Sequence, residues 1–175
     1  MPANLTVLLR QIFVFVALTA CGGREPGALT DPGFWSMSQG GDPFPEHALA
    51  YEGCPFAEAG AFFEEAGVLE VDTGRCGYLV LQQPSVRAVR AGDTLLWTVS
   101  HAPLVAAEPA TAHIAIALDG AVLWDFNVDI PFPAEVFDLS AEAPAHARAD
   151  STVTIHIHNH GENAWTFSEG RVEPQ

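Results

Sequence analysis

The chain has 175 residues, 22 of them acidic and 7 basic, and its formal net charge of −15 argues against binding to the phosphates of nucleic acid. Every basic residue is an arginine, and no lysine-rich patch for anionic lipid headgroups is present. The length suits one domain with a single hydrophobic core.

Residues 1–20 have the features of an export signal. Arg10 precedes an apolar run, residues 12–18, which is too short to span a bilayer as a helix. The following tetrapeptide Leu18–Cys21, Leu-Thr-Ala-Cys, resembles the lipobox of bacterial lipoproteins. The resemblance implies cleavage after residue 20 and a lipid anchor on Cys21 in the cell envelope. Gly22, in place of an aspartate, implies the outer membrane.

The three cysteines fit an exported protein. Lipidation of Cys21 leaves Cys54 and Cys76, which we expect to form a disulfide in an oxidising compartment. The bond would close a loop of about 20 residues and stabilise the folded state by about 3 kcal/mol.

Residues 21–45 are rich in Gly, Pro, Ser and Asp, which predicts a flexible tether before one domain over residues 46–175. Within this stretch, Phe34 and Trp35 are expected to pack onto the domain, with an exposed binding pair as the alternative. Helix formers and an interrupting Gly60 predict at most one short helix near residues 56–66, with a first strand as the alternative.

From residue 68 onward, short alternating runs separated by turn residues predict about eight strands. The runs are residues 69–73, 78–82, 94–101, 111–118, 121–128, 135–141, 151–160 and 164–168. Asp119-Gly120 predicts a tight hairpin. The turn formers at residues 161–163 predict a second hairpin, between the last two strands.

Short strands at this spacing predict an all-β fold, an antiparallel β-sandwich of the jelly-roll type. The layout of residues 92–97, 121–125, 151–158 and 163–167 resembles the galactose-binding-like jelly roll of non-catalytic carbohydrate-binding modules. The resemblance implies a glycan as ligand and a structural Ca²⁺. Three polar residues with side-chain oxygen atoms alternate along one strand face, for which a solvated face is the favoured interpretation and Ca²⁺ binding the alternative. They are Asp125, Asn127 and Asp129.

Imidazoles gather on one predicted strand. Successive strand residues point to opposite faces, so His156, His158 and His160 lie opposite the isoleucines. Neighbouring rings on such a face lie about 6 to 7 Å apart, and two of them can converge on one Zn²⁺ or Cu²⁺. The third ligand would come from another segment, and the candidates are His113, His101 and Glu162. The favoured interpretation is a polar strand face without metal, whose imidazoles are hydrogen-bonded to neighbouring side chains, and no cofactor is expected; bound Zn²⁺ or Cu²⁺ is the alternative.

The sequence offers little support for catalysis. His156-x-His158 followed by Glu162 partly resembles the first metal motif of cupins, but no room remains for the second motif. Gly-x-Ser-x-Gly, which marks one class of hydrolase nucleophile, does not occur. The sequence therefore predicts an envelope-anchored lipoprotein with a non-catalytic β-sandwich that binds a glycan or envelope component, or has a structural role. A metal-binding lipoprotein is the alternative.

Overall fold

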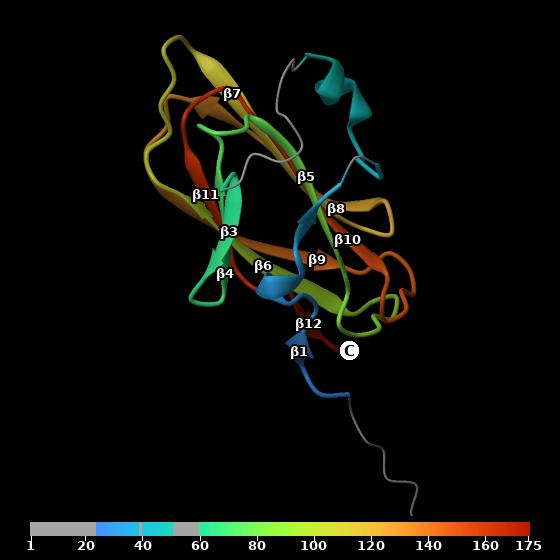
Figure 1. Cartoon of the computed structure of the whole chain (residues 1–175). Coiled ribbons are helices and arrows are strands. Elements are labelled where there is room, and N and C mark those ends of the chain that lie inside the picture. Colours follow the sequence, from blue (N-terminus) through green and yellow to red (C-terminus); the bar gives the residue numbers. More distant parts are fainter. Residues whose placement is uncertain (1–23, 39, 51–59) are drawn as a thin grey trace, which may run out of the picture.

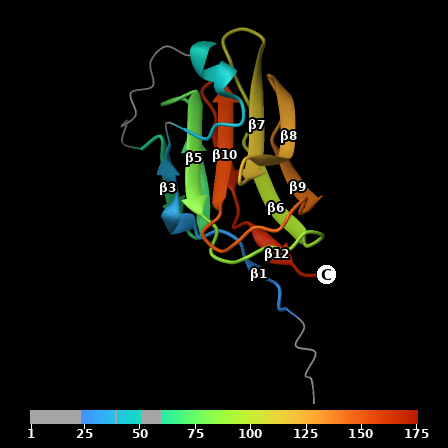
Figure 2. The same ribbon diagram turned by 90° about the vertical axis from the view of Figure 1, so that its right-hand side faces the viewer.

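Two antiparallel sheets pack face to face in the computed structural model, which describes residues 24–38, 40–50 and 60–175 (Figures 1 and 2). The eight predicted strands are confirmed, each to within two residues at either end. They are β4 (Val68–Asp72), β5 (Tyr78–Pro84), β6 (Thr94–His101), β7 (Ala110–Leu118), β8 (Ala121–Ile130), β9 (Glu135–Glu142), β10 (Thr152–Asn159) and β11 (Ala164–Phe167).

The strand order is that of a jelly roll. One sheet contains β4-β11-β6-β9 and the other contains β5-β10-β7-β8, so the chain passes from one sheet to the other after most strands. The exception is the β7–β8 hairpin, in which Asp119 (φ 48°) and Gly120 (φ 80°) both adopt the left-handed conformation of a type I′ turn. The predicted fold class and the predicted Asp119-Gly120 hairpin are confirmed.

The predicted hairpin between the last two strands is wrong. β10 pairs with β5 and β7 in one sheet, whereas β11 pairs with β4 and β6 in the other. Residues 160–163 are therefore a crossing between sheets. A buried network holds this crossing, in which the Asn159 side chain donates to Thr73 Oγ1 (2.9 Å) and to the Gly161 carbonyl (2.7 Å).

Four short strands extend the two sheets. They are β1 (Gly27–Ala28), β2 (Ser36–Met37), β3 (Phe62–Glu65) and β12 (Arg171–Glu173). β1 pairs with β12, β2 with β5, and β3 with β4. Through β1 and β2, the described part of residues 24–45 thus belongs to the sandwich, where the sequence predicted a flexible tether. Of the predicted short helix near 56–66, residues 62–65 form a strand and residues 56–59 lie outside the described part.

Two 3-10 helices, η1 (Pro32–Phe34) and η2 (Pro45–Ala50), complete the described elements. Trp35, beside η1, packs against the core with its ring 6.4 Å from that of Trp97, as predicted, whereas Phe34 is 56% exposed. No helix within the described ranges combines the length and apolar character that a membrane crossing requires.

The core lies between the inner faces of the sheets, where alternate residues of each strand are buried. Its largest fully buried side chains include Trp97, Trp165, Phe167, Ile114 and Ile116. The outer face of the β5-β10-β7-β8 sheet is also partly covered, by residues 42–47. Val80, Ala115 and Ala117 on that face are buried as a result. Figure 2 shows the η2 segment lying at the upper end of β5 and β10.

Candidate functional site

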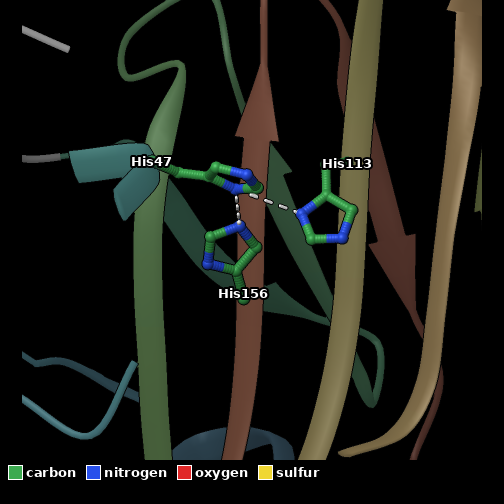
Figure 3. A group of neighbouring side chains, drawn as sticks. All are labelled: His47, His113 and His156. Atoms are coloured by element: carbon green, nitrogen blue, oxygen red, sulfur yellow. Dashed lines mark hydrogen bonds between the residues drawn. The ribbon is translucent and has the colours of Figure 1, made fainter. Parts of the chain in front are cut away.

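Three histidines from separate elements converge on the outer face of the β5-β10-β7-β8 sheet. His113 lies on β7, His156 on β10, and His47 on η2 above them (Figure 3). His47 Nδ1 lies 3.1 Å from His156 Nε2 and 3.3 Å from His113 Nδ1. One ring nitrogen from each residue lies within 4.8 Å of the other two. We call these residues the histidine trio.

A carboxylate orients each of the two strand histidines. His156 Nδ1 donates to Asp42 Oδ1 at 2.8 Å, and His113 Nε2 donates to Asp125 Oδ1 at 2.6 Å. In a neutral imidazole, one nitrogen carries the proton and the other a lone pair. These hydrogen bonds therefore leave the lone pairs on His156 Nε2 and His113 Nδ1, the atoms that face His47.

The three facing nitrogens of the trio could hold a metal ion. A neutral His47 can donate a proton from Nδ1 to only one of the two lone pairs that it faces. A metal cation, in contrast, can accept lone pairs from all three ring nitrogens at once. Zn–N bonds of about 2.0 to 2.1 Å place tetrahedral ligand nitrogens about 3.3 Å apart, close to the separations from His47. Carboxylates that hold the second nitrogen of a ligating histidine are the usual outer partners of such sites.

Burial and neighbouring charges shift the pKa values of His47 and Asp42. The pKa of His47 is lowered by burial and by the neighbouring His156 and His113. Burial acts to raise the pKa of Asp42, but hydrogen bonds from His156, Tyr78 and the Phe44 amide outweigh it and bring that pKa to about 2. Asp42 therefore stays ionised, and a neutral His47 stays available as a ligand.

Phe44 and Tyr78 enclose the trio with aromatic rings. The Phe44 ring lies 4.6 Å from the His113 ring in an edge contact and 5.3 Å from the His156 ring. The Tyr78 hydroxyl donates to Asp42 Oδ2. His156 is 0% exposed. Segment 42–47 thus supplies the His47 imidazole, the Asp42 carboxylate and the Phe44 ring that packs over the strand histidines.

Of the other predicted metal ligands, two lie close to the trio and two lie far from it. His158 lies beside the trio, with its ring 4.9 Å from the His47 ring, and His160 lies past the end of β10, 4.3 Å from the His158 ring. His101 is on β6 in the opposite sheet, in contact with Trp165. Glu162 is exposed near Gly74. Neither of the last two reaches the trio.

The remaining sequence-based sites have mixed outcomes. Of the Ca²⁺ candidates, Asp125 is engaged by His113, while Asn127 and Asp129 are exposed on the same strand. Cys76 is buried, but its predicted partner Cys54 lies outside the described residues, as does the lipobox. The disulfide and the lipidation of Cys21 stay predictions.

Sequence reasoning missed His47 and Asp42. Both lie in a stretch without periodicity, and each contacts residues more than 60 positions later in the chain. A signal was present on β7, where Ala115 and Ala117 alternate with isoleucines. An apolar residue on both faces of a strand indicates a sheet covered on both sides.

Acidification is expected to weaken the metal-free fold through His158. Burial and the neighbouring histidines lower its pKa from 6.5 to about 4, so between these values the unfolded chain binds the proton more readily. Stability contributed by the neutral ring is thus present above pH 6.5 and lost as the pH falls toward 4, by up to about 3 kcal/mol. We expect urea unfolding in a chelator to show this loss between pH 7.5 and 4.5.

The matched control is a His158→Asn variant. In both proteins, acidification protonates carboxylates and reduces the repulsion among them. The difference between the two profiles of unfolding free energy against pH therefore reports the contribution of the His158 imidazole. Parallel profiles would contradict the expectation.

Apart from the histidine trio, a hollow lies between the edge strands of the two sheets. It has a volume of about 480 Å³ and runs between β8 and β9. Half-buried aromatic side chains line it, namely Trp124, Phe126, Phe132 and Phe137. Asp129 and Glu135 stand at the rim. The buried Trp124 indole nitrogen has no hydrogen-bond partner within the described part of the chain. We call this hollow the β8–β9 groove.

Several solved structures resemble the fold at low sequence identity. A family 27 carbohydrate-binding module, described by its specific mannan recognition, is 11% identical over 87% of this chain and 97% of its own, with a TM-score of 0.48. A family 4 carbohydrate-binding module is 11% identical over 82% and 96%, with a TM-score of 0.42. The N-terminal cellulose-binding domain of Cellulomonas fimi β-1,4-glucanase C is 13% identical over 65% and 79%, with a TM-score of 0.39.

No family model matches the chain, and no curated protein matches it either. Function therefore has to be inferred from the geometry of the site.

Proposed function

We propose that this protein is an exported, lipid-anchored metal-binding protein whose β-sandwich holds one Zn²⁺ or Cu²⁺ ion through the histidine trio. The observation that carries the proposal is the convergence of three ring nitrogens. Hydrogen bonds to Asp42 and Asp125 orient the two strand histidines so that their lone pairs face His47. Neutral imidazole suits both ions. The role is binding without catalysis.

Titration of the chelator-treated protein with Zn²⁺ and with Cu²⁺ tests the proposal. We expect one ion per chain, and an Asp125→Asn variant should bind it about 10- to 100-fold more weakly, because the outer carboxylate raises the basicity of His113. Asp129→Asn is the matched control, since Asp129 is exposed on the same strand and makes no contact with the trio. No binding, or equal affinities of the two variants, would overturn the proposal.

The lipid anchor is supported by the signal and lipobox in the sequence. Arg24, three residues after Cys21, is fixed by a 2.5 Å ion pair with Asp93, and β1 follows it. Figures 1 and 2 place β1 at one end of the sandwich and η2 at the other. A lipid on Cys21 would therefore leave the histidine trio facing away from the membrane.

Replacing Cys21 by alanine is expected to release the protein from membranes into the soluble envelope fraction, because its acyl chains supply the anchoring free energy. Fractionation of cells that express wild type or Cys21→Ala, followed by immunoblotting, measures the change. Continued membrane association of the variant would contradict lipidation at this cysteine.

A second candidate function is glycan binding in the β8–β9 groove. Aromatic walls with a few polar groups are typical of ligand sites, and half-buried aromatic side chains, Trp124 among them, line this groove. The carboxylates at the rim can accept hydrogen bonds from hydroxyl groups. A glycan array probed with wild type and Trp124→Ala tests this role, and the absence of any Trp124-dependent signal would remove it.

A further inference from the structure

Histidines in this chain are concentrated in one place. Of the seven in the sequence, five form a continuous series of ring contacts on the outer face of one sheet. The series consists of the trio together with His158 and His160. His101 and His146 are outside it. The proposed trio site requires three histidines, so the other two call for a separate explanation.

The series runs from the interior to the surface. His156 is 0% exposed, His113 is 7% exposed and His158 is 8% exposed, whereas His47 is half-buried and His160 is exposed. His158 stands directly opposite His113 in the register of β10 and β7, which places it on the same face. His160 follows where β10 ends, so its ring reaches solvent.

Each step along the series is short enough for two rings to share an ion. A metal bound about 2.0 to 2.1 Å from a ring nitrogen lies about 3 Å from the ring centroid, so rings within about 6 Å of each other can hold it together. The His47 and His158 rings are 4.9 Å apart, and those of His158 and His160 are 4.3 Å apart.

We propose that His158 and His160 form a transfer path through which the metal ion passes between solvent and the histidine trio, so that the protein is a metal carrier and not a closed structural site. This inference rests on the proposed function. In each step, one metal–nitrogen bond forms as the bond to the preceding ring breaks. The ion keeps its charge and oxidation state, and no electron or further reactant is needed.

The surroundings of the trio favour this path. Phe44 lies against His113 and His156, and segment 42–47 covers them from above. His158 is buried and contacts both His47 and the exposed His160, so it links the trio to a histidine that reaches solvent. The net charge of −15 concentrates cations around the exposed end of the path.

Metal exchange kinetics test the path. Wild type and His160→Ala are loaded with one equivalent of Cu²⁺ and mixed with excess EDTA in a stopped-flow instrument, and loading of the metal-free proteins is followed in the same way. We expect His160→Ala to slow both loading and release by at least about tenfold, since a stepping ligand is lost. Its equilibrium affinity should stay that of wild type, because the trio is intact.

His146→Ala is the matched control, since it removes an exposed histidine outside the series and should leave both rates unchanged. His158→Asn should slow exchange as His160→Ala does. Wild-type rates in both path variants would overturn the inference while leaving the proposed function in place. If wild type itself bound no Cu²⁺ at equilibrium, the proposed function would fail and the path with it.

Discussion

Replacing His156 by alanine is expected to weaken Zn²⁺ and Cu²⁺ binding by more than about 100-fold, beyond the loss that removal of an outer partner causes. In the proposed site, His156 would supply one of three ligand nitrogens, and it is the ring that Asp42 orients. Two remaining histidines would hold the ion only weakly. Competition titration against a chelator of known affinity measures the change.

The fold of this variant needs its own control, because His156 is fully buried and its loss leaves Asp42 without that partner. His156→Gln retains a polar side chain, and unfolding curves show whether either variant is folded. A folded His156→Ala protein that binds the ion as tightly as wild type would exclude the trio as the site.

Replacing Trp165 by alanine is expected to lower the free energy of unfolding by about 3 to 5 kcal/mol, the range for large aromatic side chains in a core. Trp165 is 0% exposed on β11, and its indole N–H donates to Asn159 Oδ1 at 3.3 Å. The variant therefore loses core packing and a member of the network that holds the crossing from β10 to β11. Urea denaturation at neutral pH measures the loss.

Phe34→Ala serves as the comparison, because Phe34 is 56% exposed and its truncation should change stability by less than about 0.5 kcal/mol. Trp165→Phe retains most of the volume without the N–H donor, so it separates packing from the hydrogen bond. A loss below about 1 kcal/mol in Trp165→Ala would contradict the assignment of this residue to the core.

The eight main strands could be predicted because each is long enough to show alternation and is bounded by turn residues. β1 and β2 have only two residues each, too few to show any period. The β10–β11 hairpin was predicted wrongly because the turn formers at 161–163 are compatible with a hairpin and equally with a crossing between sheets. Pairing partners are decided by long-range packing, which local turn chemistry does not encode.

Half of the candidate site could be predicted in the same way. Alternation along residues 151–160 placed His156 and His158 on one face, and His113 was a candidate from a neighbouring strand. The burial of that face was not predicted, because the segment that covers it has no periodic pattern. His47 reaches the site through contacts 66 and 109 positions away in the chain, which no local signal records.

X-ray absorption spectroscopy of the protein loaded with one equivalent of Zn²⁺ tests most directly whether the trio binds metal. The geometry of His47, His113 and His156 predicts a first shell with three imidazole nitrogens at about 2.0 to 2.1 Å. The imidazole signal should fall in His156→Ala and stay unchanged in His146→Ala. A first coordination shell of oxygen atoms alone would contradict a metal site at the trio. So would an imidazole signal that is the same in wild type and His156→Ala.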